Sequence, residues 1–152
     1  MDERPRFLAD EMLGTLVKWL RIMGYDTSYA KDMRDEDIKA MAVREGRALL
    51  TRDKALARAA GGSGLYVDSD VIEEQVAQVA KAYGLDFDAS NTRCALCNGT
   101  LKPISRDEAR KEAPARSLDM TERFFRCEGC RRLYWEGTHW NNIKERMRDF
   151  GL

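Results

Sequence analysis

Four cysteines in two C-x-x-C pairs constrain the fold of this chain more than any other feature. Cys94 and Cys97 form the first pair, Cys127 and Cys130 form the second, and no other cysteine occurs in the 152 residues. The two-residue spacing lets both sulfurs of a pair face one tetrahedral ion, so two pairs supply all four ligands of a structural zinc site. Four thiolates leave no open position for water. The predicted Zn²⁺ therefore folds the segment and does not catalyse.

The location of the protein bears on this interpretation. No stretch approaches the roughly 20 apolar residues that a membrane helix needs. The charged start at residues 1–7 lacks the apolar centre of a signal peptide. We therefore expect a cytoplasmic protein with no membrane association.

The cysteines could instead form two disulfides, or one C-x-x-C could act as a redox pair. We favour zinc because a reducing cytoplasm disfavours disulfides, and because a redox pair needs only one C-x-x-C. The flanking segments 100–104, 124–126 and 132–135 are typical of the strands of a small ribbon. The charged segment 105–117 between the pairs is predicted to be an exposed excursion, partly helical before Pro114.

Charge is distributed unevenly along the chain, although the formal net charge is zero. Residues 1–91 contain 13 Lys and Arg against 17 Asp and Glu, whereas residues 92–152 contain 13 against 9. An acidic part joined to a basic part is typical of a chain with two tasks, although uneven scatter between two small modules gives the same numbers. We predict a nuclease-like domain at 1–90 and a zinc ribbon with a basic C-terminal helix at 91–152.

The first ninety residues alternate between strand patterns and helix patterns. Short apolar or mixed runs predict strands at 7–9, 25–30, 48–51 and 65–67. Helical spacing of apolar residues predicts helices at 13–23, 35–45, 55–60 and 72–83. This alternation implies an α/β fold in which helices flank a parallel sheet with right-handed crossovers.

Acidic residues recur where the predicted strands end. Asp10 follows the first strand, Asp53 follows the third, and Asp35 begins a helix that leaves the same edge. In such sheets functional groups gather beyond the carboxyl ends of the strands. Carboxylates gathered there repel one another unless a cation lies among them, which predicts a hard divalent ion. Such an ion lowers the pKa of a water and neutralises a phosphate under attack, so the expected chemistry is phosphodiester hydrolysis.

Each of these acids also has a purely structural explanation. Asp35 suits the N-cap of its helix, and Asp10 and Asp53 can cap the helices that follow them. For any one residue alone, capping is the better explanation, but their shared position at one edge favours a site. Thr51 is a weaker candidate, whose hydroxyl could orient a carboxylate.

The residues at these positions resemble a known family. FLADEMLGTLVKWLRIMGYDT, DEDI, ALLTRDKAL, the C-x-x-C pairs and a late YWEGTHW are similar to the family named for the C-terminal ribonuclease domain of the mut-seven exonuclease. That family has a PIN-like fold joined to a zinc ribbon. The resemblance covers nearly the whole chain and implies a ribonuclease that depends on Mg²⁺ or Mn²⁺ and acts on single-stranded RNA.

The resemblance also implies which acids form the site. They would be Asp10, Asp35 and Asp53. Asp68 or Asp70 is a candidate for the fourth acid of a PIN-like site. Glu36 or Asp37 takes the place of Asp35 if that helix starts later than we expect.

Aromatic and basic residues of the ribbon suit contact with RNA. Three rings can stack on unpaired bases beside arginines that contact phosphates: Tyr134, Trp135 and Trp140, with Arg126, Arg131 and Arg132. The same rings can instead form the small core that a ribbon needs. His139, the only histidine, could donate to a phosphate or replace a cysteine on zinc, but packing or a local hydrogen bond fits better because four cysteines already fill the zinc.

The whole sequence thus predicts a metal-dependent ribonuclease in which an acidic α/β domain cuts and a basic ribbon holds RNA. The tail at 141–152 is typical of a short amphipathic basic helix, suited to docking on the first domain or on RNA. The alternative is a non-catalytic module in which the acids are caps and the ribbon recognises RNA, a ribosomal surface or a protein partner. PIN-like domains often form dimers, but no apolar stripe is left over here to assign to one, so the oligomeric state stays open.

Overall fold

A four-stranded parallel sheet forms the first part of the computed structural model, which describes residues 4–152 apart from the side chains of 138 and 139. Its strands are β1 (Phe7–Asp10), β2 (Thr27–Ala30), β3 (Ala48–Thr51) and β4 (Gly64–Tyr66). Their order across the sheet is β2-β1-β3-β4, and all neighbours are parallel. The predicted α/β fold is confirmed.

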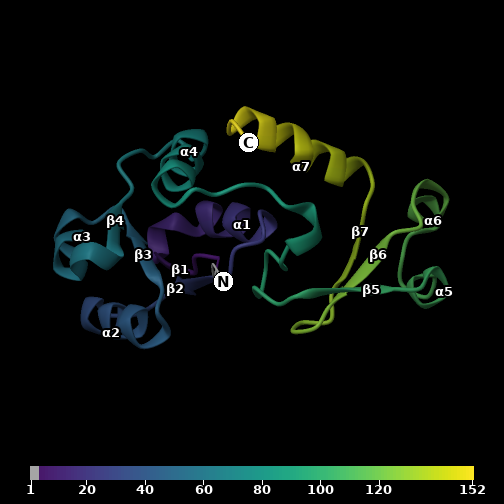
Figure 1. The fold of residues 1–152 in the computed structure, drawn as a ribbon. Coiled ribbons are helices and arrows are strands. Elements are labelled where there is room, and N and C mark those ends of the chain that lie inside the picture. Colours follow the sequence, from purple (N-terminus) through teal and green to yellow (C-terminus); the bar gives the residue numbers. More distant parts are fainter. Residues whose placement is uncertain (1–3) are drawn as a thin grey trace.

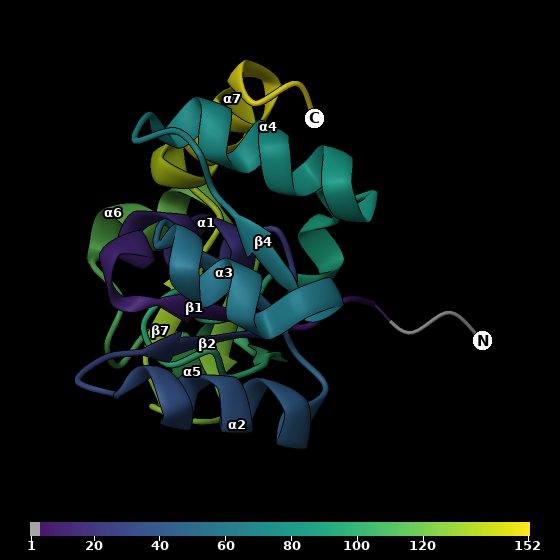
Figure 2. The ribbon, with the colours of Figure 1, turned by 90° about the vertical axis from the view of Figure 1, so that its left-hand side faces the viewer.

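Helices cover both faces of this sheet (Figure 1 and Figure 2). The helices of this part of the chain are η1 (Glu11–Leu13), α1 (Gly14–Ile22), α2 (Asp35–Glu45), α3 (Lys54–Ala60), η2 (Gly61–Ser63), α4 (Ile72–Tyr83) and η3 (Ala89–Asn91). Alternate strand residues point to opposite faces. Phe7 and Leu50 pack in one core with α1 and α4, whereas Leu8 and Leu49 pack in another with α2 and α3. None of the helices within residues 4–152 is long and apolar enough to cross a membrane.

The ribbon forms a separate three-stranded antiparallel sheet. Its strands β5 (Leu101–Ile104), β6 (Phe124–Cys127) and β7 (Leu133–Trp135) are ordered as they occur in the chain. The excursion between β5 and β6 contains two short helices, α5 (Arg106–Ala109) and α6 (Ala115–Met120), at the end of the ribbon far from the first sheet (Figure 1). Pro114 separates them as the N-cap of α6, so a helix follows it as well as the one predicted before it.

The last helix, α7 (Thr138–Asp149), runs back from the ribbon to the first sheet's helices (Figure 1). Ile143, Met147 and Phe150 are buried in the core that α1 and α4 share. The Phe150 ring meets the Trp19 ring edge-on, with centroids 5.3 Å apart. Of the two predicted contacts of the tail, the structure shows docking on the first domain. The division of the chain between residues 90 and 91 stays a prediction.

A seam of hydrogen bonds joins the ribbon to the amino ends of the strands. Asn98 accepts from the Thr27 backbone N–H (3.0 Å) and donates to the Asp26 carboxylate (2.7 Å). Arg21, at the end of α1, donates to the Thr27 carbonyl (2.9 Å) and to the Ala95 carbonyl (2.9 Å). Because Asp26 and Thr27 lie at the start of β2, the ribbon is attached at the end of the sheet opposite to the predicted acidic edge.

The docking of α7 predicts a large effect of Met147→Ala. The side chain is 2% exposed, and replacing a buried Met by Ala leaves a cavity that lowers the free energy of unfolding by about 2–5 kcal/mol. Lys144→Ala, at an exposed position of the same helix, is expected to change it by less than about 0.5 kcal/mol. Urea denaturation measures both, and equal effects of the two substitutions would show that α7 is not part of this core.

Candidate functional site

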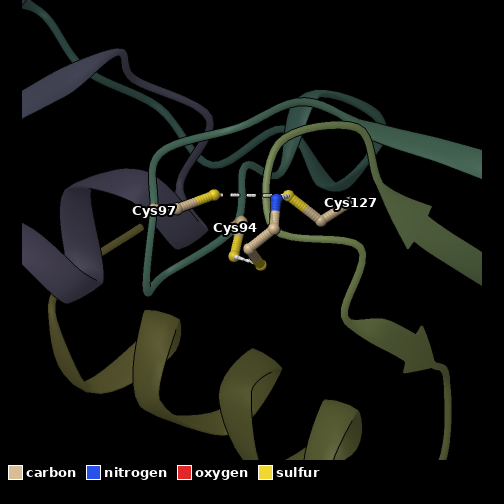
Figure 3. A group of neighbouring side chains, drawn as sticks. Cys94, Cys97 and Cys127 are labelled. Carbon is tan, nitrogen blue, oxygen red and sulfur yellow. Dashed lines mark hydrogen bonds between the residues drawn. The ribbon is translucent and has the colours of Figure 1, made fainter.

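The four cysteines come together between the first sheet and the ribbon. Their sulfur atoms all lie within 4.8 Å of one another, with 3.4 Å between Cys97 and Cys127 and 3.7 Å between Cys94 and Cys130. Four sulfurs at ~2.3 Å from a tetrahedral Zn²⁺ are about 3.8 Å apart, whereas a disulfide needs about 2.05 Å. Figure 3 shows Cys94, Cys97 and Cys127 turned toward a common centre. The cluster suggests a structural zinc site, as predicted.

Two glycines allow the loops to close around this centre. A Cβ at Gly99 would lie 2.7 Å from the Cys127 sulfur, and one at Gly129 would lie 3.1 Å from the Cys97 sulfur. The backbone N–H of Gly99 donates to Cys97 (3.4 Å) and that of Gly129 donates to Cys127 (3.3 Å). The absence of side chains therefore brings donors to sulfurs that carry negative charge when they bind a metal.

The pKa values of the thiol groups differ from one another, and a bound cation would remove this difference. Burial raises the pKa of Cys94, but the Tyr134 hydroxyl (2.9 Å) and the Cys97 and Leu96 backbones donate to its sulfur and bring the pKa to about 7. Burial and the contact with Cys127 raise the pKa of Cys97 to about 11. Since a coordinating thiol is deprotonated outright, Zn²⁺ would make all four equivalent and release protons.

Arg21 supplies positive charge behind the first cysteine pair. Its guanidinium is buried, donates to the carbonyls of Ala95 (2.9 Å) and Leu96 (3.3 Å), and makes no ion pair with a carboxylate among the described residues. Burial lowers its pKa, and the nearby charges of Cys94 and Cys97 raise it. Four thiolates on one Zn²⁺ leave a net negative charge, so Arg21 is placed to balance it. Sequence analysis missed this residue because it lies within an ordinary helical pattern.

Asp10 and Asp53 are connected through Thr51 at the carboxyl edge of the first sheet. Asp10 ends β1 and is 9% exposed, while Thr51 ends the neighbouring β3. The Thr51 hydroxyl donates to Asp10 Oδ2 (2.8 Å) and accepts from the Asp53 backbone N–H (3.0 Å). The hydroxyl thus orients the Asp10 carboxylate, the role considered for it from sequence.

Both aspartates also cap the helices that follow them. Asp10 Oδ1 accepts from the Glu11 N–H (2.8 Å), and Asp53 Oδ1 accepts from the N–H groups of Ala55 (2.9 Å) and Leu56 (3.2 Å). Each cap uses one oxygen. No hydrogen bond reaches Asp53 Oδ2 from the described residues. Capping and metal binding therefore do not compete for the same atoms at Asp53.

The remaining acids are more exposed. The N-cap of α2 is Arg34, so the expectation that Asp35 caps this helix is wrong by one residue, within the usual uncertainty of a helix boundary. Asp35 instead lies in the first turn, where its charge suits the helix dipole. Glu36 and Asp37 follow it, also exposed, and the Asp37 carboxylate pairs with Arg34 (3.5 Å).

Asp68 and Asp70 follow β4 and are exposed. Within residues 4–152, leaving aside the side chain of His139, no carboxylates form a group of three whose ligand atoms lie within 4.8 Å of one another; only the cysteines do. The structure therefore connects Asp10 and Asp53 through Thr51 but gathers no third acid with them among the described residues. The assignment of a third and fourth acid stays a prediction.

The ribbon residues predicted to bind RNA have different surroundings. Arg126 is only 11% exposed and pairs with Glu112 of the excursion at 2.6 Å, so its charge is already balanced. Arg131 and Arg132 are exposed. The side chain of His139 lies outside the described residues.

The aromatic residues predicted to stack on bases also have different surroundings. The Tyr134 hydroxyl is hydrogen-bonded to the Cys94 sulfur, which gives this ring a role at the cysteine cluster. Trp140 packs against Phe87, with ring centroids 6.1 Å apart. Trp135 is 37% exposed and so presents a large ring to solvent.

Comparison with known proteins identifies one family. A family model described as the Mut7-C RNAse domain matches residues 5–147, which is nearly the whole chain. The match spans the sheet, the acidic edge, the four cysteines and most of α7. No curated protein and no solved structure matches the chain significantly.

The close approach at Gly99 predicts that Gly99→Ala weakens zinc binding. The added methyl group must displace the Cys127 sulfur, and we expect affinity to fall at least about tenfold, or roughly 1.4 kcal/mol. Gly62→Ala is the matched control, because a Cβ there meets nothing within 4 Å. Competition with a chromogenic chelator measures both affinities. Unchanged zinc affinity of Gly99→Ala would contradict the proposed closure of the cysteine cluster.

Proposed function

Because this chain belongs to the Mut7-C RNase domain family and is thus a ribonuclease, we propose that it hydrolyses single-stranded RNA at the edge formed by Asp10 and Asp53. Asp35 is proposed as the third acid. The observation that carries this proposal is the Thr51 hydroxyl, which connects the two aspartates across neighbouring strand ends. A threonine buried for packing alone would not need this pair of contacts.

The edge suits a hard divalent ion. Asp10, Asp35 and Asp53 make no ion pair with a basic side chain among residues 4–152, so their charge is left to be balanced by something else. Mg²⁺ usually keeps several waters and binds through one or two carboxylates plus substrate phosphates, which fits an open edge better than a closed cage. When bound, Mg²⁺ or Mn²⁺ would neutralise the phosphate under attack and favour deprotonation of the attacking water.

The residues of the chain then have distinct tasks. Thr51 holds the Asp10 carboxylate in one orientation, and the two N-cap hydrogen bonds hold Asp53. Orientation by such partners lowers the cost of assembling a site around the substrate. Asp35, at the exposed start of α2, would complete the acidic edge when substrate is bound.

The ribbon is proposed to hold the RNA. Its exposed Arg131 and Arg132 suit phosphate contacts, and the exposed Trp135 ring suits stacking on an unpaired base. The excess of basic residues in 92–152 supports this division of tasks. The non-catalytic alternative rests on the capping roles of Asp10 and Asp53, but each cap uses only one carboxylate oxygen.

Asp10→Asn and Asp53→Asn are predicted to abolish cleavage without unfolding the protein. Asparagine retains a capping oxygen but loses the negative charge and, at position 10, the second oxygen that accepts from the Thr51 hydroxyl. We expect the rate with Mn²⁺ to fall roughly a hundredfold or more. Asp119→Asn, at an exposed position outside this edge, serves as the matched control. Gel analysis of labelled single-stranded RNA, with a chelator arm, measures the rates. Cleavage that survives both substitutions would place the reaction elsewhere.

Thr51→Val is predicted to act through metal affinity. The substitution keeps the shape of the side chain but leaves Asp10 Oδ2 without its donor. We therefore expect the affinity for Mn²⁺ to fall about 10–100-fold, seen as a higher Mn²⁺ concentration for half-maximal activity. Thr51→Ser keeps the hydroxyl and should keep the half-maximal Mn²⁺ concentration of the unchanged protein. A purely structural role would instead lower thermal stability in the valine variant and leave the half-maximal Mn²⁺ concentration unchanged.

A further inference from the structure

A pocket lies where the ribbon meets the first module, away from the acidic edge. Its volume is about 320 Å³, within the range of small-ligand sites of ~300–1,000 Å³. Residues far apart in the chain line it, among them Ile22 at the end of α1, Thr92 and Ala95 of the connecting segment, Pro103 of β5, and Trp140 of α7. Asp10, Asp35 and Asp53 are not among its lining residues.

The wall of this pocket combines aromatic rings with basic side chains. The rings are Phe125, Tyr134, Trp135 and Trp140. The charged residues are Lys18, Arg93, Arg123 and Glu136. Glu136 is paired with Arg123 at 3.5 Å, so its negative charge is already countered. The pocket therefore offers flat apolar surfaces beside an excess of positive charge.

We propose that this pocket binds one unpaired nucleobase of single-stranded RNA, with the neighbouring phosphate held by Lys18 and Arg93. This rests on the proposed function in taking RNA as the substrate. Aromatic rings stack on bases of any sequence, and lysine or arginine beside them contacts the backbone. A base within a duplex is already stacked and paired and cannot enter, so the pocket selects single strands.

The two cations are available for a phosphate. Lys18 is exposed, and no carboxylate pairs with it among the described residues. Arg93 uses its Nε atom for the Asn98 carbonyl (3.0 Å), while its terminal nitrogens make no hydrogen bond within the described part of the chain. A protein segment docking in an apolar groove would not require this surplus of positive charge, which is why we favour RNA.

The two tryptophans of the wall have an exposed ring face or a donor that is unpaired within the described residues. Trp135 remains 37% exposed although it lies beside the pocket. The indole N–H of Trp140 is buried and has no acceptor among the described residues. The Trp135 ring is thus not fully used in packing the ribbon, and a stacked base would cover it.

The position of the pocket separates the anchored base from the cut. Ile22 ends α1 on the side of the seam, whereas Asp10 precedes this helix at the opposite end of the sheet. A nine-residue helix is about 14 Å long at 1.5 Å per residue. We therefore expect the anchored base to add affinity without changing the chemistry at the acidic edge.

Binding without turnover tests this inference. The full chain carrying Asp10→Asn, loaded with zinc, is titrated against a labelled oligouridylate of about ten nucleotides without Mg²⁺ or Mn²⁺, and anisotropy is measured. Adding Trp135→Ala should weaken binding roughly tenfold or more, whereas Trp135→Phe, which keeps a stacking ring, should stay within about threefold. Uridine monophosphate should displace the oligonucleotide at lower concentrations than inorganic phosphate does.

Salt dependence tests the phosphate contact separately. Lys18→Ala should reduce the slope of log affinity against log salt concentration by about 0.7, the value for one phosphate of a single strand. Lys81→Ala is the matched control, since Lys81 is exposed on α4 and lines no part of the pocket.

Three results would overturn the inference: affinity of Trp135→Ala within about twofold of its parent, an unchanged salt slope for Lys18→Ala, or equal competition by inorganic phosphate. Because no cleavage occurs in these titrations, such results would leave the proposed ribonuclease site standing. Conversely, a protein that binds as expected but never cleaves RNA would contradict the proposed function alone.

Discussion

The parallel pairing of four short strands is the constraint on which the arrangement of this molecule depends. Parallel strands all end at one edge and all begin at the other. Asp10 and Asp53 therefore meet at the carboxyl edge, where the Thr51 hydroxyl connects them. The amino edge is left for the ribbon, which is attached there through Arg21 and Asn98. The distance between the acidic edge proposed to cut RNA and the ribbon proposed to hold it is thus set by the sheet and not by a flexible linker.

Electrostatics explains why the ribbon can be so small. A three-stranded sheet has little core of its own, and four sulfurs within 4.8 Å of one another would repel as thiolates without a cation. Zinc would supply the missing stabilisation, and buried Arg21 would balance the remaining negative charge from the side of α1. The return of α7 to the core of α1 and α4 then fixes the ribbon at both ends. Loss of zinc would consequently disturb the pocket at the seam before it disturbed the acidic edge.

Local patterns in the sequence were sufficient to predict the strands, the main helices and the four clustered cysteines, because period, caps and ligand spacing are properties of short segments. They missed α6, which follows Pro114. The same patterns suggested the Thr51 contact, since parallel strands share an edge. They could not reveal that Glu112 neutralises Arg126, or that Tyr134 donates to Cys94, because these pairs depend on how the excursion and β7 fold back. The pocket was equally hidden: Lys18 and Trp135 come from opposite ends of the chain and meet only through the docking of the two sheets. The N-cap of α2 is Arg34 and not the expected Asp35, a difference of one residue that local propensity does not resolve.

The central claim is that Asp10, at the end of β1, and Asp53, just after β3, share one divalent ion at the carboxyl edge. Anomalous diffraction from crystals soaked with Mn²⁺, recorded on both sides of the Mn absorption edge, tests it most directly because zinc and manganese are then distinguished. The account predicts a manganese peak in contact with carboxylate oxygens of both Asp10 and Asp53. An edge without a manganese peak in protein that cleaves RNA, or a peak that touches neither aspartate, would contradict it.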